Sequence, residues 1–375
     1  MGYYEYAATC LFGLERLVGD EIEALGYARL STTDGRITFS GDEGAAARFN
    51  VFSRYAERLY IKLGDFPANS FTELFDGTKD LPVECFIGKD DAFPVTGSSI
   101  RSKLTSIPDC QKIIKKAIVE KLKESYAVEW FEESAVKVPV EFFIDRDVCT
   151  LMIETSGEPL HKRGYRPQSN AAPLRETLAA AMVKLSRPRE DVLLWDPFCG
   201  SGTIAVEAAM MMTDRAPGLT RGFAAEKFEF LDEDVWRLAR EEARDRIKKS
   251  AFTAYASDID EGCVALTKAN AKRAGVFDNV RAFKMDARDI ETRGRRGTVV
   301  CNPPYGERLS DRRGIEKLYP EVGRAFARLG SWQIYVISSV PDFEKLYGKK
   351  ADKVRKLYNG RLKCGFYQYY KKQGS

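Results

Sequence analysis

The chain has 375 residues, enough for two or three domains, and its 44% apolar and 30% charged residues are ordinary for globular proteins. Its 59 Lys and Arg exceed its 55 Asp and Glu by only four, so a polyanion site would need basic residues gathered locally. The single histidine, His161, excludes chemistry built on paired histidines. The eight cysteines form no CxxC pair and no zinc-ligand spacing, so we expect reduced thiols and no metal site.

The N-terminal sequence MGYYEYAATC lacks the basic region and the apolar core of a secretory signal peptide. The chain contains no run of about 18 apolar residues that would span a membrane. These observations predict a soluble, cytoplasmic protein, and they leave its oligomeric state open.

Residues 1–65 alternate strand and helix signals in the order β-α-β-β-α-β, which predicts a small α+β domain of the split βαβ type. The expected elements are a strand at Tyr3–Thr9, a helix over 14–25, a hairpin at Asp34-Gly35, a helix near 43–56 and a strand at Arg58–Leu63.

Residues 66–155 continue the α+β pattern and contain a basic segment. Residues 97–126 hold seven Lys or Arg against three Asp or Glu, and their apolar residues fall at helical spacing. This helix is either an ordinary solvated one or a surface for a polyanion. Two strands around the turn 145–147 follow, and Pro139 predicts that the first lies at a sheet edge.

The composition changes over residues 156–172, which are rich in Gly, Pro and Ser. This composition predicts a basic linker that lies over a surface. From residue 173 to residue 375, strands separated by helical patterns predict a parallel, doubly wound sheet with its last strand near 364–370.

The first loop of this region lies in VLLWDPFCGSGTIAVEAAM, residues 192–210, between an apolar strand and a helix. No Lys follows Gly202, which excludes a P-loop, and GSG alone lacks the dinucleotide fingerprint. The loop is either a tight structural turn or a ligand loop at the carboxyl ends of parallel strands, and the preceding DPFC favours the ligand loop.

Acidic residues follow the next two strands. An acid at the end of the second strand, here Asp258 or Asp260 in SDID, typically accepts hydrogen bonds from ribose hydroxyls, although either could cap the next helix. Asp286, in FKMDAR, ends the following strand and would lie near the base of the same nucleoside.

The third loop lies in GTVVCNPPYGERL, residues 297–309. Two successive prolines at the end of the strand fix the backbone and present the Asn302 amide and the Pro303 carbonyl as rigid acceptors. With the Tyr305 ring beside them, this arrangement suits an exocyclic amine on a flat nucleobase, whereas NPPY by itself could be a plain turn.

These motifs resemble known families. DPFCGSGT resembles the S-adenosylmethionine loop of class I methyltransferases, and NPPY resembles motif IV of those that methylate exocyclic or amide nitrogen. More narrowly, the C-terminal half resembles the RlmL-type rRNA guanine-N2 methyltransferases in LHKRGYR (160–166), APLRETLAAAM (172–182), DPFCGSGTIAVEAA and NPPYGERL. The N-terminal half is similar to that family's THUMP domain in SIRSKL (99–104) and IIKKAIVEKL (113–122). The likeness covers almost the whole chain, which resembles the short type with one methyltransferase domain.

The resemblance implies an α/β fold whose C-terminal part is a doubly wound, Rossmann-like class I methyltransferase domain and whose N-terminal half is α+β. The expected parts are a ferredoxin-like subdomain (1–65), a THUMP RNA-binding domain (66–155), the basic linker (156–172) and the methyltransferase domain (173–375).

The resemblance also implies S-adenosylmethionine as the cofactor. Its methionine part would lie against Asp196, Pro197, Phe198, Cys199, Gly200, Ser201, Gly202 and Thr203, with Thr177 closing that end. Asp258 would bind the ribose and Asp286 the adenine, with Ile259 and Ala287 as further cofactor contacts. Asp258 lies 56 residues after Gly202, so a helical insertion is expected between them.

At the substrate side, the resemblance implies that Asn302 and Pro303 hold the target amine, that Pro304 stiffens the loop and that Tyr305 stacks on the base. In-line methyl transfer needs positioning rather than a strong base, which agrees with the single histidine.

RNA is the implied partner. Its expected contacts are Arg101, Lys103, Lys115, Lys116, His161, Lys162, Arg163 and Arg166, together with the run RGRR (293–296) and the basic tail. Between residues 345 and 372 there are ten Lys or Arg and one acid; the aromatic residues among them suit single-stranded nucleic acid or pack inside a last strand.

The expected activity is methylation of the N2 amine of a guanine in large-subunit (23S) rRNA, on a base that is single-stranded or flipped out. The alternatives are a tRNA guanine-N2 methyltransferase, an adenine-N6 DNA or glutamine-N5 methylase that shares NPPY, and a non-enzymatic RNA-binding assembly factor. The THUMP-like half argues against DNA and protein substrates, and the intact glycines, Asn302 and Tyr305 argue against lost catalysis.

Overall fold

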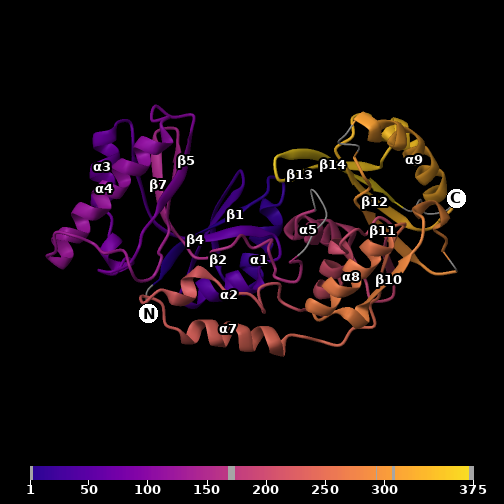
Figure 1. The fold of residues 1–375 in the computed structure, drawn as a ribbon, viewed down its shortest axis with the longest axis horizontal. Coiled ribbons are helices and arrows are strands. Elements are labelled where there is room, and N and C mark those ends of the chain that lie inside the picture. The colour runs from indigo at the N-terminus through magenta and orange to yellow at the C-terminus, as the bar shows by residue number, and fades with distance from the viewer. Residues whose placement is uncertain (1–2, 168–173, 293, 306–308, 371–375) are drawn as a thin grey trace.

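The computed structural model describes residues 3–167, 174–292, 294–305 and 309–370, without the side chains of residues 309–313. Each of two lobes is built on a seven-stranded sheet, and the lobes lie side by side along the long axis of the molecule (Figure 1). Within the described residues, no helix combines the length and the apolar character needed to cross a membrane, and no group of three or more His, Cys, Asp or Glu is placed to hold a metal ion.

The N-terminal sheet has the strand order β2-β3-β1-β4-β7-β6-β5, and only the β5–β6 pair is parallel. Its strands are β1 (Tyr4–Cys10), β2 (Ala28–Thr33), β3 (Arg36–Gly41), β4 (Ala56–Pro67), β5 (Val95–Ile100), β6 (Val140–Asp145) and β7 (Val148–Glu154). Its helices are α1 (Glu15–Ala24), α2 (Gly44–Phe52), α3 (Phe71–Lys79) and α4 (Ile107–Tyr126).

One long strand joins the two halves of this lobe. β4 pairs with β1 on one side and with β7 on the other, so the division expected between residues 65 and 66 falls inside a strand. The sheet is continuous, so the two domains expected on either side of residue 65 share one layer.

The expectation that Pro139 marks an edge strand is wrong. β6 lies between β7 and β5, and Pro139 precedes it. The carbonyl of Pro139 accepts a hydrogen bond from the amide of Glu154 at 2.9 Å, so the missing N–H of the proline leaves the ladder intact.

The C-terminal sheet has the order β10-β9-β8-β11-β12-β14-β13. Its strands are β8 (Leu193–Asp196), β9 (Ala254–Asp258), β10 (Val280–Lys284), β11 (Gly297–Cys301), β12 (Gln333–Ser338), β13 (Lys353–Asn359) and β14 (Leu362–Tyr369). Its helices are α5 (Glu176–Ser186), α6 (Thr203–Met212), α7 (Asp234–Asp245), α8 (Glu261–Arg273), α9 (Leu309–Ala327) and α10 (Phe343–Tyr347).

The expected parallel sheet is present from β10 to β12, but the sheet differs beyond β12. β14 runs antiparallel to both β12 and β13, so the sheet is mixed, and the sequence analysis missed β13 altogether. In β14, Phe366 and Tyr369 are buried at 0% and 2% exposure, which shows that these aromatic residues pack inside the strand. Lys371 and Lys372 of the expected basic tail, like Arg293 of RGRR and residues 168–172 of the expected linker, lie outside the described residues.

Strand order places the site. The chain runs outward from β8 through β9 to β10 and then returns to β11 on the other side of β8. The order therefore reverses between β8 and β11, and open α/β sheets bind ligands at the carboxyl ends of the strands at such a point. The loops that follow Asp196 and Cys301 meet there.

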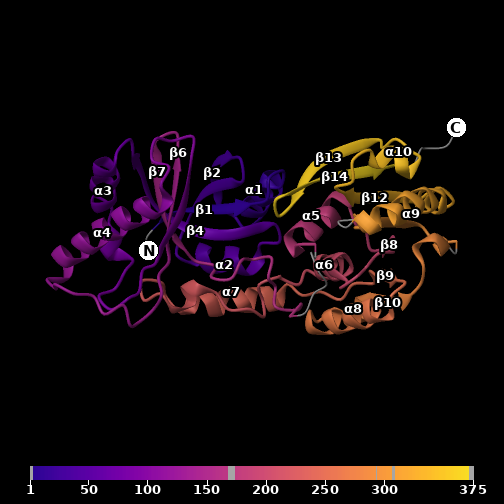
Figure 2. The same ribbon diagram turned by 45° about the horizontal axis from the view of Figure 1, so that its top comes forward.

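The segment between α6 and β9 contacts the N-terminal lobe as well as its own lobe. α7 packs against α2 of the N-terminal lobe, and Arg48 makes a two-bonded ion pair with Glu242 at 2.8 and 2.9 Å. In Figure 2 α7 lies along α2, beneath the N-terminal sheet.

Candidate cofactor and methyl-transfer site

The loop after β8 is held rigidly by its neighbours. The amide of Gly200 donates to Asp258 at 3.0 Å, the hydroxyl of Thr267 donates to the Gly200 carbonyl at 3.0 Å, and Asn270 donates to the Ser201 carbonyl at 2.8 Å. These contacts join residues 200–201 to the end of β9 and to α8, so the backbone of the loop is fixed before any ligand binds.

Gly202 is required by packing as well as by conformation. It precedes α6 with φ +80°, and a Cβ added to it would lie 2.5 Å from Cγ2 of Thr267. The second glycine of GSG thus lets α8 approach the loop closely.

Asp196 is the buried acid at the end of β8. It is 2% exposed, and one carboxylate oxygen accepts from the Phe198 amide at 3.1 Å. Burial, reinforced by the neighbouring charge of Asp258, raises the pKa of this carboxyl to about 8. No Lys or Arg of the described part of the chain forms an ion pair with it.

These features fit the expected cofactor. S-Adenosylmethionine carries a sulfonium and an ammonium group, and a buried carboxylate without a cationic partner is complementary to such a ligand. The residues that would hold the methionine part are those expected from the sequence, Asp196 to Thr203, on their fixed backbone.

The two acids after β9 have separate tasks. Asp260 is the N-cap of α8 and accepts from the Gly262 amide at 2.8 Å, which leaves Asp258 as the acid that faces the loop of Gly200. Ile259 between them is 65% exposed, an apolar side chain available to a flat ligand. Asp258 also accepts from the Asp260 amide at 3.1 Å, and its contact with the ribose remains a prediction.

Asp286 follows β10 and is tied to Arg288. Its carboxylate accepts from the backbone amide and the guanidinium of Arg288, both at 2.9 Å, and these bonds lower the pKa of Asp286. Ala287 beside it is buried at 3% exposure. The contact of Asp286 with the adenine remains a prediction.

The NPPY loop follows β11 directly. Cys301 is fully buried, and the Tyr305 hydroxyl donates a hydrogen bond to the side-chain oxygen of Asn302. The side-chain oxygen expected to accept from the target amine therefore already accepts from Tyr305 in this conformation.

A tyrosine that the sequence analysis did not single out supports this loop. Tyr319, on α9, donates to the carbonyl of Pro304 at 2.9 Å and lies 3.3 Å from the hydroxyl of Ser338 on β12. Its partner lies 15 residues away in the chain, and no local pattern marks it.

The prediction that Arg163 and Arg166 bind RNA is wrong. Arg163 is 2% exposed, and its guanidinium lies 3.6 Å from Glu207 of α6, a carboxylate that also accepts from Tyr165 at 3.1 Å. The Arg166 side chain is 7% exposed and pairs with Glu176 at 3.0 Å. Leu160, Arg163 and Tyr165 of the expected linker are therefore buried, whereas Lys162 and Gly164 stay exposed.

Arg166 also contacts the cofactor loop. Its guanidinium donates to the hydroxyl of Thr203 at 2.7 Å, at the first residue of α6. Arg166, which the sequence analysis expected to bind RNA, thus supports the cofactor loop instead.

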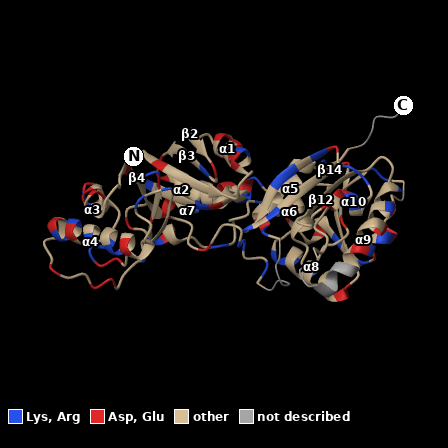
Figure 3. Ribbon diagram, turned by 90° about the horizontal axis from the view of Figure 1, so that it is seen from above, with Lys and Arg blue, Asp and Glu red and all other residues tan. Residues whose placement is uncertain are grey.

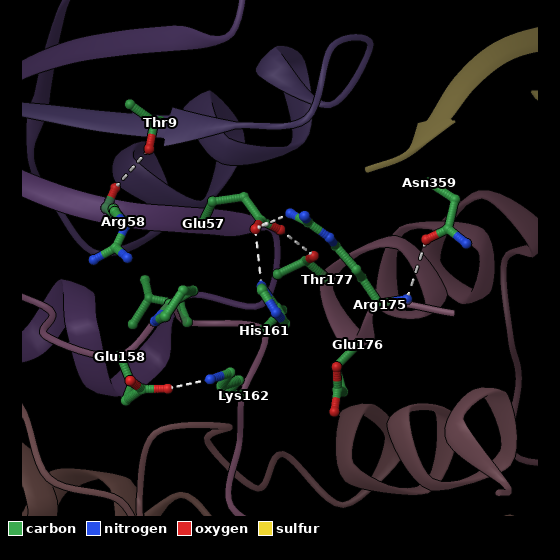
Figure 4. Close-up of polar contacts among 12 residues, drawn as sticks. Thr9, Glu57, Arg58, Glu158, His161, Lys162, Arg175, Glu176, Thr177 and Asn359 are labelled. Carbon is green, nitrogen blue, oxygen red and sulfur yellow. Dashed lines mark hydrogen bonds and ion pairs between the residues drawn. The ribbon is translucent and has the colours of Figure 1, made fainter. Parts of the chain in front are cut away.

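His161 and Thr177 belong to a polar junction between the lobes (Figure 4). Glu57 of β4 accepts from Thr177 at 2.6 Å and from Arg175 at 2.6 Å, and His161 Nδ1 lies 2.9 Å from the same carboxylate. Arg175 in turn donates its backbone amide to Asn359 of β13. The Thr177 hydroxyl is thereby committed to the junction, and its expected place at the methionine end has no support from this contact.

The remaining cations expected to bind RNA lie on the surface, mostly with partners. Arg101 forms a two-bonded pair with Asp145, Lys103 donates to Asn69, Lys115 to Glu133, and Lys162 pairs with Glu158. Lys116 is exposed and lies 5.8 Å above the ring of Phe75. Surface pairs of this kind are weak enough to exchange for phosphates.

Comparison with known proteins agrees with this organisation. Protein-family models match the RlmL ferredoxin-like domain at residues 5–60, the THUMP domain at 68–154 and the RMKL-like methyltransferase domain at 163–368. The chain is 42% identical over 375 residues to YpsC of Bacillus subtilis (strain 168), a candidate RNA methyltransferase, covering 99% of this chain and 97% of that one.

Solved structures are equally similar. A possible methylase of Clostridium difficile 630 is 44% identical with a TM-score of 0.96, and each chain is covered completely. SMU.472, a candidate methyltransferase in complex with SAH, is 37% identical with a TM-score of 0.93 over both whole chains. TrmN from Thermus thermophilus, at 19% identity, a TM-score of 0.71 and coverage of 99% and 100%, shares the fold.

The matched domains cover both lobes, the loops after β8 and β11 lie at the switch point, and a similar protein holds the demethylated cofactor. The chain therefore belongs to the RlmL-type family of S-adenosylmethionine-dependent methyltransferases with a THUMP domain.

Proposed function

We propose that this protein methylates the exocyclic N2 amine of a guanine in large-subunit rRNA. One observation carries the proposal. The NPPY loop follows β11 and lies beside the cofactor loop that follows β8, and the other lobe of the chain contains a THUMP domain. The first feature supports transfer to a planar amine, and the second supports an RNA that bears it.

The chain's own residues do three things in this reaction. Asn302 and Pro303 accept the two N–H donors of the amine, which turns its lone pair out of the ring plane and stabilises the positive charge that develops on nitrogen. Tyr305 gives up its bond to Asn302 and covers the face of the base. Asp196 to Thr203 hold the cofactor, which supplies an electrophilic methyl group, in line with that amine. The proton of the amine leaves to water, so no strong base is required.

RNA as the substrate is supported by the THUMP match and by YpsC, whose name describes a candidate RNA methyltransferase. A guanine in a duplex would be out of reach of a site at the end of a sheet, so the target base is unpaired or flipped out. Such an activity places the protein in the cytoplasm with its rRNA substrate.

An adenine-N6 methylase is the second candidate. A Listeria monocytogenes (str. 4b F2365) protein assigned as a predicted N6-adenine-specific DNA methylase is 41% identical with a TM-score of 0.93, covering 99% of this chain and 97% of that one. Adenine N6 is also an exocyclic amine on a flat base, so the loop chemistry alone does not separate the two.

The test is transfer of labelled methyl groups from S-adenosylmethionine to protein-free rRNA, to tRNA and to DNA, followed by nucleoside analysis. N2-methylguanosine in rRNA is the expected result. The same nucleoside in tRNA alone would overturn the rRNA assignment, N6-methyladenine in DNA would overturn both the base and the polymer, and no transfer despite cofactor binding would point to an assembly role.

A further inference from the structure

A cavity of about 520 Å³ lies on the C-terminal sheet, away from the cofactor loop. It opens where α5 ends, beside the first residues of β11 and β12 and the β13–β14 hairpin. The cofactor loops lie at the opposite, carboxyl ends of β8 and β11, so this cavity is separate from the site described above.

The cavity is built by the antiparallel hairpin that ends the sheet. β14 and β13 extend the sheet beyond α5, and Lys353 and Arg355 lie on one face of β13 because side chains two apart in a strand point the same way. Lys353 is paired in register with Gln368 of β14, and Gln368 with Tyr335 of β12. Figure 3 shows Lys and Arg gathered along this hairpin beside α5.

The charge lining this cavity is positive only. Arg187, Arg189, Arg296, Lys353 and Arg355 line it, with no Asp or Glu among its lining residues. Arg296 has a distant partner, Asp191 at 3.8 Å, with both side chains about 70% exposed. The other four cations make no ion pair with any residue that the structure describes.

The nearest acid along β13 is already engaged. Asp352 precedes Lys353, and its carboxylate accepts from the backbone amide of Tyr370 at 2.7 Å. It forms no ion pair with the lining cations in the described part of the chain.

A buried donor lies among the lining residues. Gln368 is 4% exposed, and its side-chain nitrogen has no hydrogen-bond partner, whereas its side-chain oxygen accepts from the Tyr370 hydroxyl at 2.6 Å. Buried polar groups in folded proteins are nearly always paired, so this donor indicates an acceptor that is missing from the free protein. Gathered cations and an unsatisfied amide together favour an oxygen-rich anion.

We propose that this cavity binds backbone phosphates of the same RNA that enters the active site, an inference that rests on the proposed function. β11 has five residues and spans about 16 Å, so the cavity and the NPPY loop are close enough for one folded RNA to contact both. Phosphate contacts of this kind fix the register and orientation of the RNA without reading its sequence.

The experiment compares the parent protein with the double variant Arg187→Gln/Lys353→Gln. Both side chains are exposed, and Arg187 has φ +54°, a conformation that costs Gln as much as Arg. The matched control, Arg237→Gln/Arg244→Gln, removes the same charge from α7, which lies far from the hairpin in Figure 1. Affinity for protein-free 23S rRNA is measured between about 50 and 200 mM KCl, together with affinity for SAH.

The expected result is binding of the rRNA about tenfold more weakly by the cavity variant, with a salt slope shallower by about 1.4–1.8 for two lost phosphate contacts and an unchanged affinity for SAH. The control should keep the parent's affinity and slope. Parent-like binding of rRNA by the cavity variant would overturn the proposal, even if inorganic phosphate stabilised the parent thermally and did not stabilise the variant.

The experiment distinguishes failure of the cavity proposal from failure of the proposed function. A parent protein that methylates rRNA while the cavity variant binds it equally well refutes only the cavity. A parent that neither binds nor methylates rRNA refutes the function on which the cavity proposal rests.

Discussion

Asp196 illustrates the energetic cost of preparing a cationic site. Its carboxyl is 2% exposed, and burial raises its pKa to about 8 from an ordinary value of 3.8. Between these values the folded protein binds a proton that the unfolded chain has released, so the free energy of unfolding falls as the pH rises from about 4 to about 8. The cofactor's positive charge removes this penalty when it binds.

Asp196→Asn should therefore stabilise the free protein. We expect a rise in melting temperature of about 2–4 °C at pH 8, the shift that about 1 kcal/mol produces in a domain of 150–250 residues, and almost no rise at pH 4. The same variant should bind SAH about 10- to 100-fold more weakly, because its neutral amide no longer balances an ammonium group. Thermal melting at both pH values and calorimetric titration with SAH check this, and a variant less stable than the parent at pH 8 would contradict it.

Asn302 and Tyr305 allow the substrate side to be tested by a matched pair of changes. Asn302→Ala removes the acceptor that we propose for the amine and should lower kcat by about 100-fold or more. Tyr305→Phe keeps the ring but releases Asn302 from the tyrosine hydroxyl, so its kcat should stay within about threefold of the parent's. Initial rates of methyl transfer to rRNA measure both, and normal turnover by Asn302→Ala would refute the assignment.

At the scale of elements, β4, α5 and the chain between them meet at Glu57. Burial alone would raise the pKa of this carboxyl, but the bonds from His161 and Thr177 and the charge of Arg175 outweigh it and hold the pKa below its usual value. A lowered pKa means that the contribution to stability is present above about pH 4.5 and is lost as the pH falls through the lowered value.

Glu57→Gln should destabilise the protein by about 1–3 kcal/mol at pH 7, the range for losing charged hydrogen bonds at a mostly buried group, and by less below pH 4. The control is Glu158→Gln. Its pair with Lys162 is 67% and 60% exposed, so this change should stay within about 0.5 kcal/mol. Denaturant unfolding of the three proteins at both pH values provides the comparison, and equal effects of the two substitutions would show that the junction does not stabilise the protein.

Arg163 gives a second test at this scale, because it was expected on the surface and is buried in the structure. Arg163→Gln leaves Glu207, which is fully buried, without its cation and should cost about 3–5 kcal/mol of stability. Lys162→Gln, one residue earlier and 60% exposed, should cost almost nothing. If Arg163→Gln instead melted like the parent and bound RNA more weakly, the surface interpretation would be restored.

The sequence was most informative where a function needs neighbouring residues. DPFCGSGT and NPPY are local: strand, turn and helix follow one another, so the positions of Asp196 and Asn302 at strand ends and of Gly202 before α6 could be predicted. The Asp34-Gly35 hairpin and the basic helix α4 could be predicted for the same reason.

Partners distant in sequence could not be predicted. Arg163 meets Glu207 across 44 residues and Thr177 meets Glu57 across 120, and no local pattern marks either pair. β13 was missed because KVRKLYN is basic and lies on an edge strand, so its sequence resembles a charged tail although it pairs with β14. An isolated sequence shows charge but not the carboxylate that neutralises it.

At the scale of the whole molecule, the two lobes share one hydrophobic core. A single cluster of buried side chains runs from Val18 and Phe39 in the N-terminal lobe to Leu178 and Ile204 in α5 and α6. The packing of α7 against α2 and the junction at Glu57 add polar contacts between the two lobes. Because β4 pairs with β7 in one continuous sheet, the THUMP unit is also held at a fixed position relative to the active site.

A fixed spacing means that an RNA held by the THUMP unit must reach the active site by its own length and shape. Lys116 on α4 allows RNA binding by the THUMP unit to be tested, because it is exposed and forms no ion pair with any residue in the described part of the chain. Lys116→Gln should weaken binding of rRNA by about threefold and make the salt slope shallower by about 0.7–0.9, the value for one phosphate contact, while affinity for SAH stays unchanged.

Lys115 is the matched control on the same helix. Its amine lies 2.6 Å from Glu133 and 3.4 Å from the centre of the Phe93 ring, so it is engaged within the protein. Lys115→Gln should lower the melting temperature slightly and leave the salt slope of RNA binding as it is in the parent. Titrations of both variants with 23S rRNA at several salt concentrations decide the matter: a shallower slope for Lys115→Gln, or a parent-like slope for Lys116→Gln, would place the remote RNA contact on another face of the THUMP unit.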